Sequence, residues 1–166
     1  MSRRLVAYGI AACVFGLDRV TKLLIREYMS LEDVIAVVPG FFNVVHTENR
    51  GIAFGLMSGG DVEWRSFFLI GLTALILAFV GAVLWQSSPG GMAASRLSRL
   101  GLSLVLGGAL GNFYDRLLNG GVTDFLDFHA GEYHWPAFNV ADSGITVGAA
   151  LVLVDLWLAR RGPASK

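Results

Sequence analysis

The chain of 166 residues contains only one cysteine, Cys13, and three histidines, His46, His129 and His134. A single cysteine excludes an internal disulfide framework, and the histidines fit no metal-ligand spacing such as H-E-x-x-H. Charged residues are also scarce, at 16% of the chain, and acids and bases balance to a formal net charge of zero. We therefore expect no structural metal, no cofactor and, without a basic stripe to bind phosphates, no nucleic-acid partner.

Hydrophobic residues, by contrast, make up 54% of the chain, which is too apolar for an ordinary soluble domain of this size. A helix of about 20 apolar residues spans a hydrocarbon core of roughly 30 Å. Four segments fit that description, at about residues 5–25, 66–86, 97–118 and 139–158. The sequence predicts an α-helical membrane protein in which residues 1–166 form a single membrane domain with four transmembrane helices.

The first predicted span begins after two arginines and contains Ile10-Ala-Ala-Cys13, which resembles the lipobox of a cleaved lipoprotein signal. The apolar run before the cysteine, Leu5 to Ala12, is short for the hydrophobic region of a signal peptide. Hydrophobicity also continues past Cys13. We therefore favour an uncleaved span over a lipoprotein signal, and we expect Cys13 to be a small buried residue.

The segments at about 30–65 and 119–138 are expected to lie outside the membrane on one side. Within the first, Val34–Val38 and Phe41–Val45 are β-branched and aromatic runs joined by Pro39-Gly40, which predicts a small β-hairpin. By the positive-inside rule the other side, with both termini, is cytoplasmic. The basic residues on that side are Arg3, Arg4, Arg96, Arg99, Arg160, Arg161 and Lys166.

Polar residues gather near the end of the third predicted span, where Asn112 and Arg116 share a helix face and Asp115 lies one position aside. Ionisable groups at membrane depth are costly and suggest a functional site. The alternative is that Arg116 is an interfacial anchor that only holds Asp115. Asn112 lies deeper, where an unpaired amide is unfavourable, so we expect it to have a polar partner.

Two carboxylates flank the aromatic loop between the third and fourth spans: Asp124 shortly after one, and Asp142 in the first turn of the other. If they meet, they share a proton, so that one activates water and the other donates to a carbonyl, which suits amide hydrolysis. The helix dipole favours Asp142 as the ionised base. The alternative is that Asn139 caps the helix and Asp142 only supports the cap. Spacing does not choose Asp124 over Asp127.

Other interpretations use the same residues. Asp18 and Lys22 form an i, i+4 pair for which an interfacial ion pair is favoured over catalysis. Ser143 with Lys22 would suit a Ser/Lys hydrolase, but the chain has no G-x-S-x-G elbow. A proton-coupled transporter or a non-enzymatic assembly protein is also possible. A transporter relay needs acids at several depths, whereas the predicted acids gather near one face.

Five short motifs follow one another along nearly the whole chain. They are Asp18-Arg-Val-Thr21-Lys22, Thr47-Glu-Asn49-Arg-Gly51-Ile-Ala-Phe54, Gly107-Gly-Ala-Leu-Gly-Asn112-Phe-Tyr-Asp115-Arg116, Val122-Thr-Asp124-Phe125 and Phe138-Asn139-Val-Ala-Asp142-Ser143. In these motifs the chain resembles the bacterial lipoprotein signal peptidases, also called signal peptidase II, which are intramembrane aspartyl proteases of the bacterial inner membrane.

The resemblance implies that the catalytic aspartates are Asp124 and Asp142, in preference to Asp127. It implies an enzyme, without a cofactor, that cleaves prolipoproteins on the N-terminal side of a diacylglyceryl-modified cysteine at the extracytoplasmic face, and that globomycin-type peptides inhibit. Asp18 and Lys22 are implied to be a supporting pair. The residues implied to line the substrate site are Asn49, Asn112, Arg116 and Asn139. We further expect Gly51, Ala53 and the hairpin loop to close over the lipid-bearing cysteine.

Overall fold

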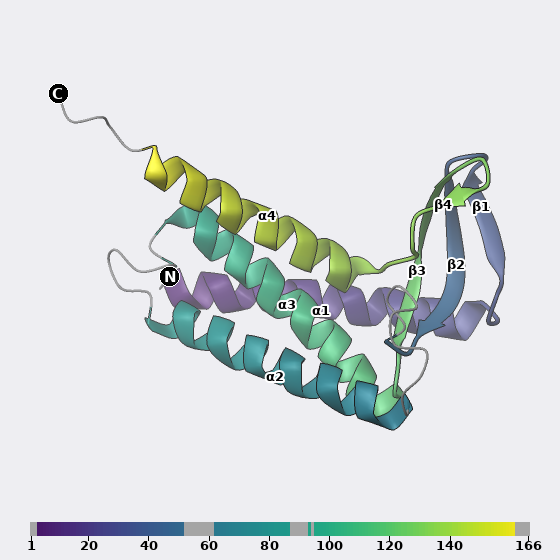
Figure 1. Ribbon diagram of the computed structural model, residues 1–166, viewed down its shortest axis with the longest axis horizontal. Helices are drawn as coiled ribbons and strands as arrows, with labels where there is room; N and C mark the ends of the chain where they lie inside the picture. Colours follow the sequence, from purple (N-terminus) through teal and green to yellow (C-terminus); the bar gives the residue numbers. More distant parts are fainter. Residues whose placement is uncertain (1–2, 52–61, 87–92, 94, 162–166) are drawn as a thin grey trace.

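The computed structural model describes residues 3–51, 62–86, 93 and 95–161, which form four long helices and a small sheet (Figure 1). The helices lie side by side, and the sheet stands at the end where α1 and α3 end and α2 and α4 begin. Both described ends of the chain lie at the opposite end of the bundle. The helices are α1 (Arg3–Tyr28), α2 (Val62–Gln86), α3 (Arg96–Asn119) and α4 (Val140–Arg160).

Each helix lies over one of the predicted spans, but the helices differ in how apolar they are. Two stretches, Phe67–Gln86 and Val140–Arg160, are long and apolar enough to cross a membrane by length and composition. In α1 and α3 the charged residues interrupt the apolar sequence, and several of them, such as Asp18 and Asp115, are fully buried. Four spans and the orientation of the termini therefore stay predictions.

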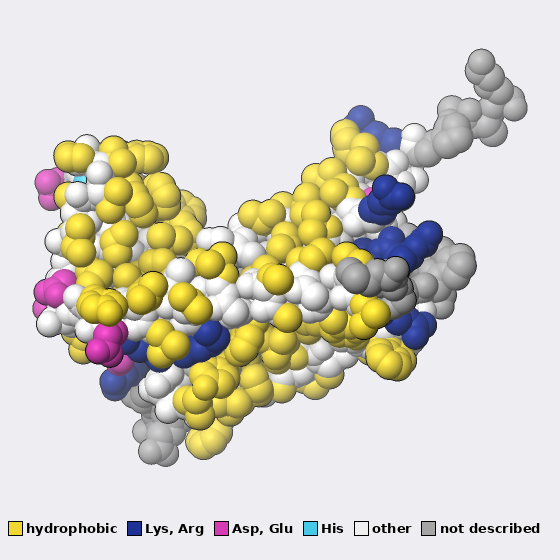
Figure 2. Space-filling model, turned by 180° about the vertical axis from the view of Figure 1, so that it is seen from behind, with side chains coloured by type: hydrophobic (Ala, Val, Ile, Leu, Met, Phe, Trp, Pro, Cys, Tyr) yellow, Lys and Arg dark blue, Asp and Glu magenta, His cyan; other side chains and the backbone are white. Residues whose placement is uncertain are grey.

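The outside of the bundle is largely hydrophobic (Figure 2). Large apolar side chains stand exposed along it, for example Phe67 at 71% and Leu153 at 67%. A monomeric soluble protein rarely exposes so much contiguous apolar surface. Acidic side chains appear at the sheet end of this face, and Lys and Arg side chains gather at the opposite end. The surface fits a membrane environment around the helices.

Helix α1 buries one narrow stripe, formed by Ala7, Ala11, Asp18 and Lys22. These positions recur at the spacing of one helix face. Cys13 lies off the stripe and is exposed, so the expectation of a buried cysteine is wrong. In a membrane, lipid is as apolar as the protein interior, so a small apolar residue such as Cys13 has no preference for burial in protein. Its apolar character therefore did not predict burial.

The glycines of α3 allow close helix contact. A Cβ atom on Gly107 would lie 2.5 Å from the backbone oxygen of Ala11 in α1, and one on Gly108 would overlap the backbone oxygen of Ala141 in α4. A Cβ on Gly111 would overlap the carboxylate of Asp18. Backbones approach this closely only where small residues face each other. Helix α3 is thus held between α1 and α4 by its glycine face.

The sheet has the antiparallel order β1 (Val34–Val38), β2 (Phe42–Asn49), β3 (Val122–Ala130) and β4 (Tyr133–His134). The hairpin of β1 and β2 confirms the prediction. The pairing of β2 with β3 was not predicted, although β3 has the β-branched and aromatic residues of a strand. In this pairing Thr47 lies opposite Asp124, so the early loop is brought to the later carboxylate.

Candidate active site

Asp124 projects from β3 into the protein and is only 3% exposed. Two amides from distant parts of the chain hold its carboxylate. Asn49, the last residue of β2, donates from Nδ2 to Oδ2 at 3.1 Å, and Asn139 donates from Nδ2 to Oδ1 at 2.7 Å. Both oxygens of this buried carboxylate are therefore fixed in direction.

Asp142 lies in the first turn of α4 and is half-buried. Its Oδ2 accepts from the backbone N–H of Asn139 at 3.3 Å, which with the cap of Asn139 makes a capping box. The predicted N-cap is thus confirmed. Its other oxygen, Oδ1, accepts from Nδ2 of Asn112 in α3 at 2.7 Å. That second contact is not part of helix capping, so capping alone does not account for this carboxylate.

Asn139 joins the two carboxylates. Its amide oxygen accepts from the backbone N–H of Asp142 at 2.9 Å while its amide nitrogen donates to Asp124. Burial raises the pKa of Asp124 to about 6, and the negative charge of Asp142 adds to the effect. Hydrogen bonds from Asn49 and Asn139 and the charge of Lys22 oppose this rise. Asp124 therefore stays protonated up to a higher pH than an ordinary carboxyl group does, as expected for the acid of a coupled pair.

Asp127 lies three residues further along β3, so its side chain points to the other face of the sheet. It accepts from Nδ2 of Asn43 at 2.9 Å and pairs with Nδ1 of His134 at 2.9 Å. Burial raises the pKa of Asp127, but the hydrogen bonds from His134 and Asn43 outweigh this and hold the pKa below its usual range. The structure thus places Asp124, and not Asp127, in the network of Asp142.

Lys22 connects the site to the interior of the bundle. Its Nζ lies 2.9 Å from Oδ2 of Asp18 and 3.1 Å from Oδ2 of Asp115, and it donates to Oδ1 of Asn112 at 2.9 Å. Oδ1 of Asp18 accepts from the backbone N–H of Ala141 at 3.0 Å. The predicted ion pair of Asp18 and Lys22 is confirmed, but both side chains are fully buried, so it is not the exposed pair expected at an interface. The pair instead fixes Asn112 from one side and the start of α4 from the other.

Arg116 does not hold Asp115, so its interpretation as an anchor for that residue is also wrong. Asp115 is paired with Lys22, with Arg26 at 3.1 Å and with Arg19. The negative charges of Asp142, Asp124 and Asp115 all act on the guanidinium group of Arg116. Its Nε is buried and has no hydrogen-bond partner among the residues that the structure describes. A buried donor beside two carboxylates is available to a carbonyl of a bound chain.

Three contributors to the network were not singled out from the sequence. Arg19 and Arg26 lie on the same face of α1 as Lys22, which was an available signal, since they are three and four residues away from it. Thr123 is fully buried, and its Oγ1 accepts from Nε of Arg26 at 2.6 Å. Its role depends on the β3 pairing, which the sequence did not reveal.

Gly51 was expected to contact substrate, and the structure shows that it holds Asn49. Its backbone N–H donates to Oδ1 of Asn49 at 2.9 Å, and its φ of +89° is the left-handed conformation that glycine tolerates. Ala53 lies outside the described residues. Within the described part of the chain, no group of three or more His, Cys, Asp and Glu side chains is arranged to hold a metal ion.

A buried network of carboxylates, enclosed by helices with apolar outer surfaces, is typical of a functional site in a membrane protein. Two solved structures, each described as a bacterial membrane enzyme, share this fold. One has a TM-score of 0.82 and 33% identity and covers 97% of this chain and 93% of its own. The other has a TM-score of 0.77 and 34% identity, with coverages of 91% and 92%.

The family model for signal peptidase (SPase) II matches residues 10–158. The lipoprotein signal peptidase of Solibacter usitatus is 48% identical over 159 residues, or 96% of this chain and 94% of that protein. The lipoprotein signal peptidase of Maridesulfovibrio salexigens is 41% identical over 157 residues, with coverages of 95% and 98%. The chain belongs to the signal peptidase II family and is therefore a membrane protease.

Proposed function

We propose that this protein is an intramembrane aspartyl endopeptidase that removes the signal peptide from prolipoproteins. It cuts on the N-terminal side of the diacylglyceryl-modified cysteine. The names of its relatives support the substrate class. The observation that carries the mechanism is the position of Asn139 between Asp124 and Asp142. Its side-chain amide donates to the carboxylate of Asp124 and its backbone N–H donates to the carboxylate of Asp142, so two carboxylates from different elements lie in one network.

In the proposed reaction Asp142 is the base and Asp124 the acid. Asp142 takes a proton from a water molecule as its oxygen attacks the scissile carbonyl carbon, and protonated Asp124 donates to the carbonyl oxygen. The tetrahedral diol that results collapses as the carbon–nitrogen bond breaks. Asp142 gives its proton to the leaving amine, and Asp124 takes a proton back from one diol hydroxyl, which leaves the carboxylic acid product and restores both aspartates. The raised pKa of Asp124 and the greater exposure of Asp142 support this division of roles.

Asn112, Lys22 and Asp18 are positioning residues in this scheme. Asn112 donates to Oδ1 of Asp142, while Oδ2 of Asp142 accepts from the backbone N–H of Asn139 in the capping box. Lys22 orients Asn112, because the ammonium group donates to the amide oxygen and thereby directs the amide nitrogen toward Asp142. Asp18 binds the backbone at Ala141, next to the base. These contacts together fix the position of Asp142 relative to α1 and α3.

The substrate binds beside the two aspartates. Arg116 contributes its buried Nε to a backbone carbonyl of the signal peptide, and the segment of Asn49 and Gly51 closes over the lipid-bearing cysteine. Globomycin-type peptides occupy the same place. Cross-linking the loop that contains Gly51 to α3 should therefore stop cleavage, and unchanged cleavage would contradict the closing movement.

The protein lies in the bacterial inner membrane with four spans, both termini in the cytoplasm and the active site at the extracytoplasmic face. The distribution of charge supports this orientation, because basic side chains gather at the end of the bundle away from the sheet (Figure 2). Membrane lipid surrounds the apolar outer surface of the helices.

The function is tested by incubating the purified protein with a lipidated prolipoprotein and identifying the products by mass spectrometry. We expect a new N-terminus at the lipid-modified cysteine, and loss of this product when globomycin is added. The same substrate without its diacylglyceryl group is the control and should be cleaved far less. A product with a different N-terminus, or none, would refute the proposal.

A further inference from the structure

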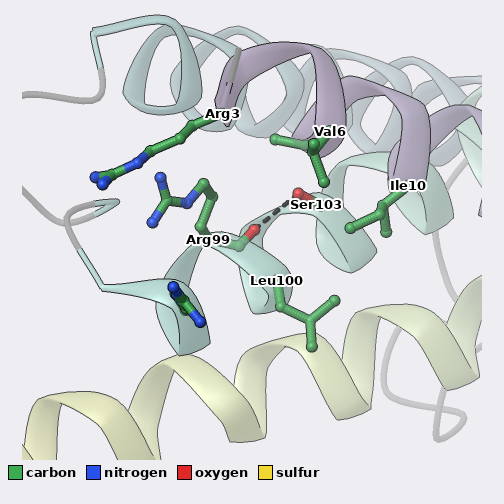
Figure 3. Close-up of a pocket in the computed structure, with 8 residues that line it drawn as sticks. Arg3, Val6, Ile10, Arg99, Leu100 and Ser103 are labelled. Atoms are coloured by element: carbon green, nitrogen blue, oxygen red, sulfur yellow. Dashed lines mark hydrogen bonds between the residues drawn. The ribbon is translucent and has the colours of Figure 1, made fainter. Parts of the chain in front are cut away.

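A cavity of about 310 Å³ opens at the end of the bundle away from the sheet (Figure 3). It lies between the beginning of α1 and the beginning of α3 and shares no residue with the network around the aspartates. The residues that line it are Arg3, Val6, Ala7, Ile10, Arg96, Arg99, Leu100 and Ser103.

The lining is divided into a cationic part and an apolar part. Arg3 is the first residue of α1, and Arg96 and Arg99 lie in the first turn of α3. Figure 3 shows the guanidinium groups of Arg3 and Arg99 directed toward the same space. The apolar part lies further along the two helices and is formed by Val6, Ala7, Ile10 and Leu100.

The three arginines make the cationic part of the cavity suitable for binding an anion. None of the described residues that line the cavity is acidic. Asp155 of α4 accepts from the hydroxyl groups of Ser95 at 2.6 Å and Ser98 at 2.5 Å. Nη2 of Arg99 donates to the backbone oxygen of Ser95 at 3.2 Å, which fixes the direction of its side chain. Three guanidinium groups around one space give it a positive potential that attracts anions.

We propose that this cavity binds the headgroup of an anionic phospholipid. The phosphate lies among Arg3, Arg96 and Arg99, because guanidinium groups match phosphate oxygens in bidentate geometry. The first carbons of the acyl chains lie along Val6 and Leu100, which are 41% and 39% exposed and so open toward surrounding lipid. Basic pockets between helices at the ends of spans suit such headgroups.

The size of the cavity and the nature of the substrate both favour lipid as the occupant. A volume of 310 Å³ corresponds to roughly ten waters at about 30 Å³ each, enough for a phosphate and the adjoining glycerol. The other chain expected at this end is the start of the signal peptide, an argument that rests on the proposed function and orientation. Signal peptides begin with basic residues, which three arginines would repel.

The proposal is tested on the purified full chain in detergent by native mass spectrometry during titration with phosphatidylglycerol, phosphatidylcholine or inorganic phosphate. Phosphatidylglycerol should bind at least tenfold more tightly than phosphatidylcholine. The triple variant Arg3→Gln, Arg96→Gln, Arg99→Gln should weaken phosphatidylglycerol binding on the order of 100-fold, since each arginine near a headgroup contributes about a factor of five. If the triple variant does not fold, Arg96→Gln alone should weaken it about fivefold.

The matched control is the triple variant Arg4→Gln, Arg160→Gln, Arg161→Gln, which removes three charges from the same end but none from the cavity. It should bind phosphatidylglycerol within about threefold of the wild type. An equal loss in both triple variants would show a general effect of charge and overturn the proposal. Displacement of the lipid by equimolar inorganic phosphate, or by a peptide with a basic start, would also overturn it.

Lipid binding and proteolysis are separable in this design. The cavity variant should still cleave a lipidated prolipoprotein in detergent, and Asp124→Asn should still bind phosphatidylglycerol like the wild type. Loss of lipid binding in Asp124→Asn would contradict an independent site. Failure of cleavage in the wild type would refute the proposed function without affecting the lipid measurement.

Discussion

Nδ2 of Asn139 lies 2.7 Å from Oδ1 of Asp124, and this hydrogen bond joins the N-cap of α4 to strand β3. The amide is fully buried and also accepts from the backbone N–H of Asp142. One side chain therefore begins a helix and sets the relation between two carboxylates. The start of helix α4 and the arrangement of the two carboxylates therefore depend on the same residue.

The two roles of Asn139 are separated by Asn139→Ser. Serine is a good N-cap and keeps the start of α4, whereas alanine would cost about 1 kcal/mol there. The shorter serine does not reach Asp124, so we expect cleavage to fall at least about 100-fold while the melting temperature changes little. Turnover and thermal unfolding in detergent check this. Cleavage near the wild-type rate would show that Asn139 serves only as a cap.

The pH dependence of cleavage reports on Asp124. Its raised pKa means that the protonated acid is present below about pH 6 and is lost as the pH rises through that value, so kcat/KM should fall on the alkaline side. Asn49→Ala removes a donor that stabilises the carboxylate, so the pKa should rise further and the alkaline midpoint should move up by about one unit. A midpoint that stays or moves down would contradict the assignment.

Hairpin, N-cap and glycine face were predictable from the sequence because each is local. Pro39-Gly40 between two β-branched runs, and Asn139 three residues before Asp142, are signals within a few residues. The burial of Lys22 was not predictable in this way, since its partner Asn112 lies 90 residues further along the chain. Likewise Asp124 and Asp127 were equivalent by spacing until β3 was known to be a strand, since residues three apart in a strand lie on opposite faces of the sheet.

The buried charges around Lys22 should matter for stability. Lys22→Met leaves the carboxylate of Asp18 buried without its cation. We expect this to lower the free energy of unfolding by roughly 3–5 kcal/mol. The double variant Asp18→Asn, Lys22→Met removes the unpaired charge and should recover part of the loss. Arg50→Met, which removes an exposed pair with Glu48, is the control and should cost under about 1 kcal/mol.

Thermal and chemical unfolding in detergent provide these values. If the double variant is no more stable than Lys22→Met alone, the interaction of Lys22 with Asp18 is not the source of the loss. The result would then point to Asn112 or Asp115 as the partner that depends on Lys22.

The contact between α3 and α4 should be sensitive to a single methyl group. A Cβ on Gly108 overlaps the backbone oxygen of Ala141, the residue before Asp142, so Gly108→Ala should cost about 1–3 kcal/mol and displace the base. Cleavage should fall together with stability. Gly71→Ala in α2 is the matched control, because a Cβ there meets nothing within 4 Å, and it should leave both unchanged.

The central claim is that Asp124 and Asp142 together activate water for hydrolysis of the signal peptide. Its most direct test is the cleavage rate of a lipidated prolipoprotein by the wild type, Asp124→Asn and Asp142→Asn, each first shown to be folded by its melting temperature. We expect a loss of at least about 1,000-fold in each single variant and no further loss in the double variant, because the two groups act as a unit. Cleavage that survives both substitutions would contradict it.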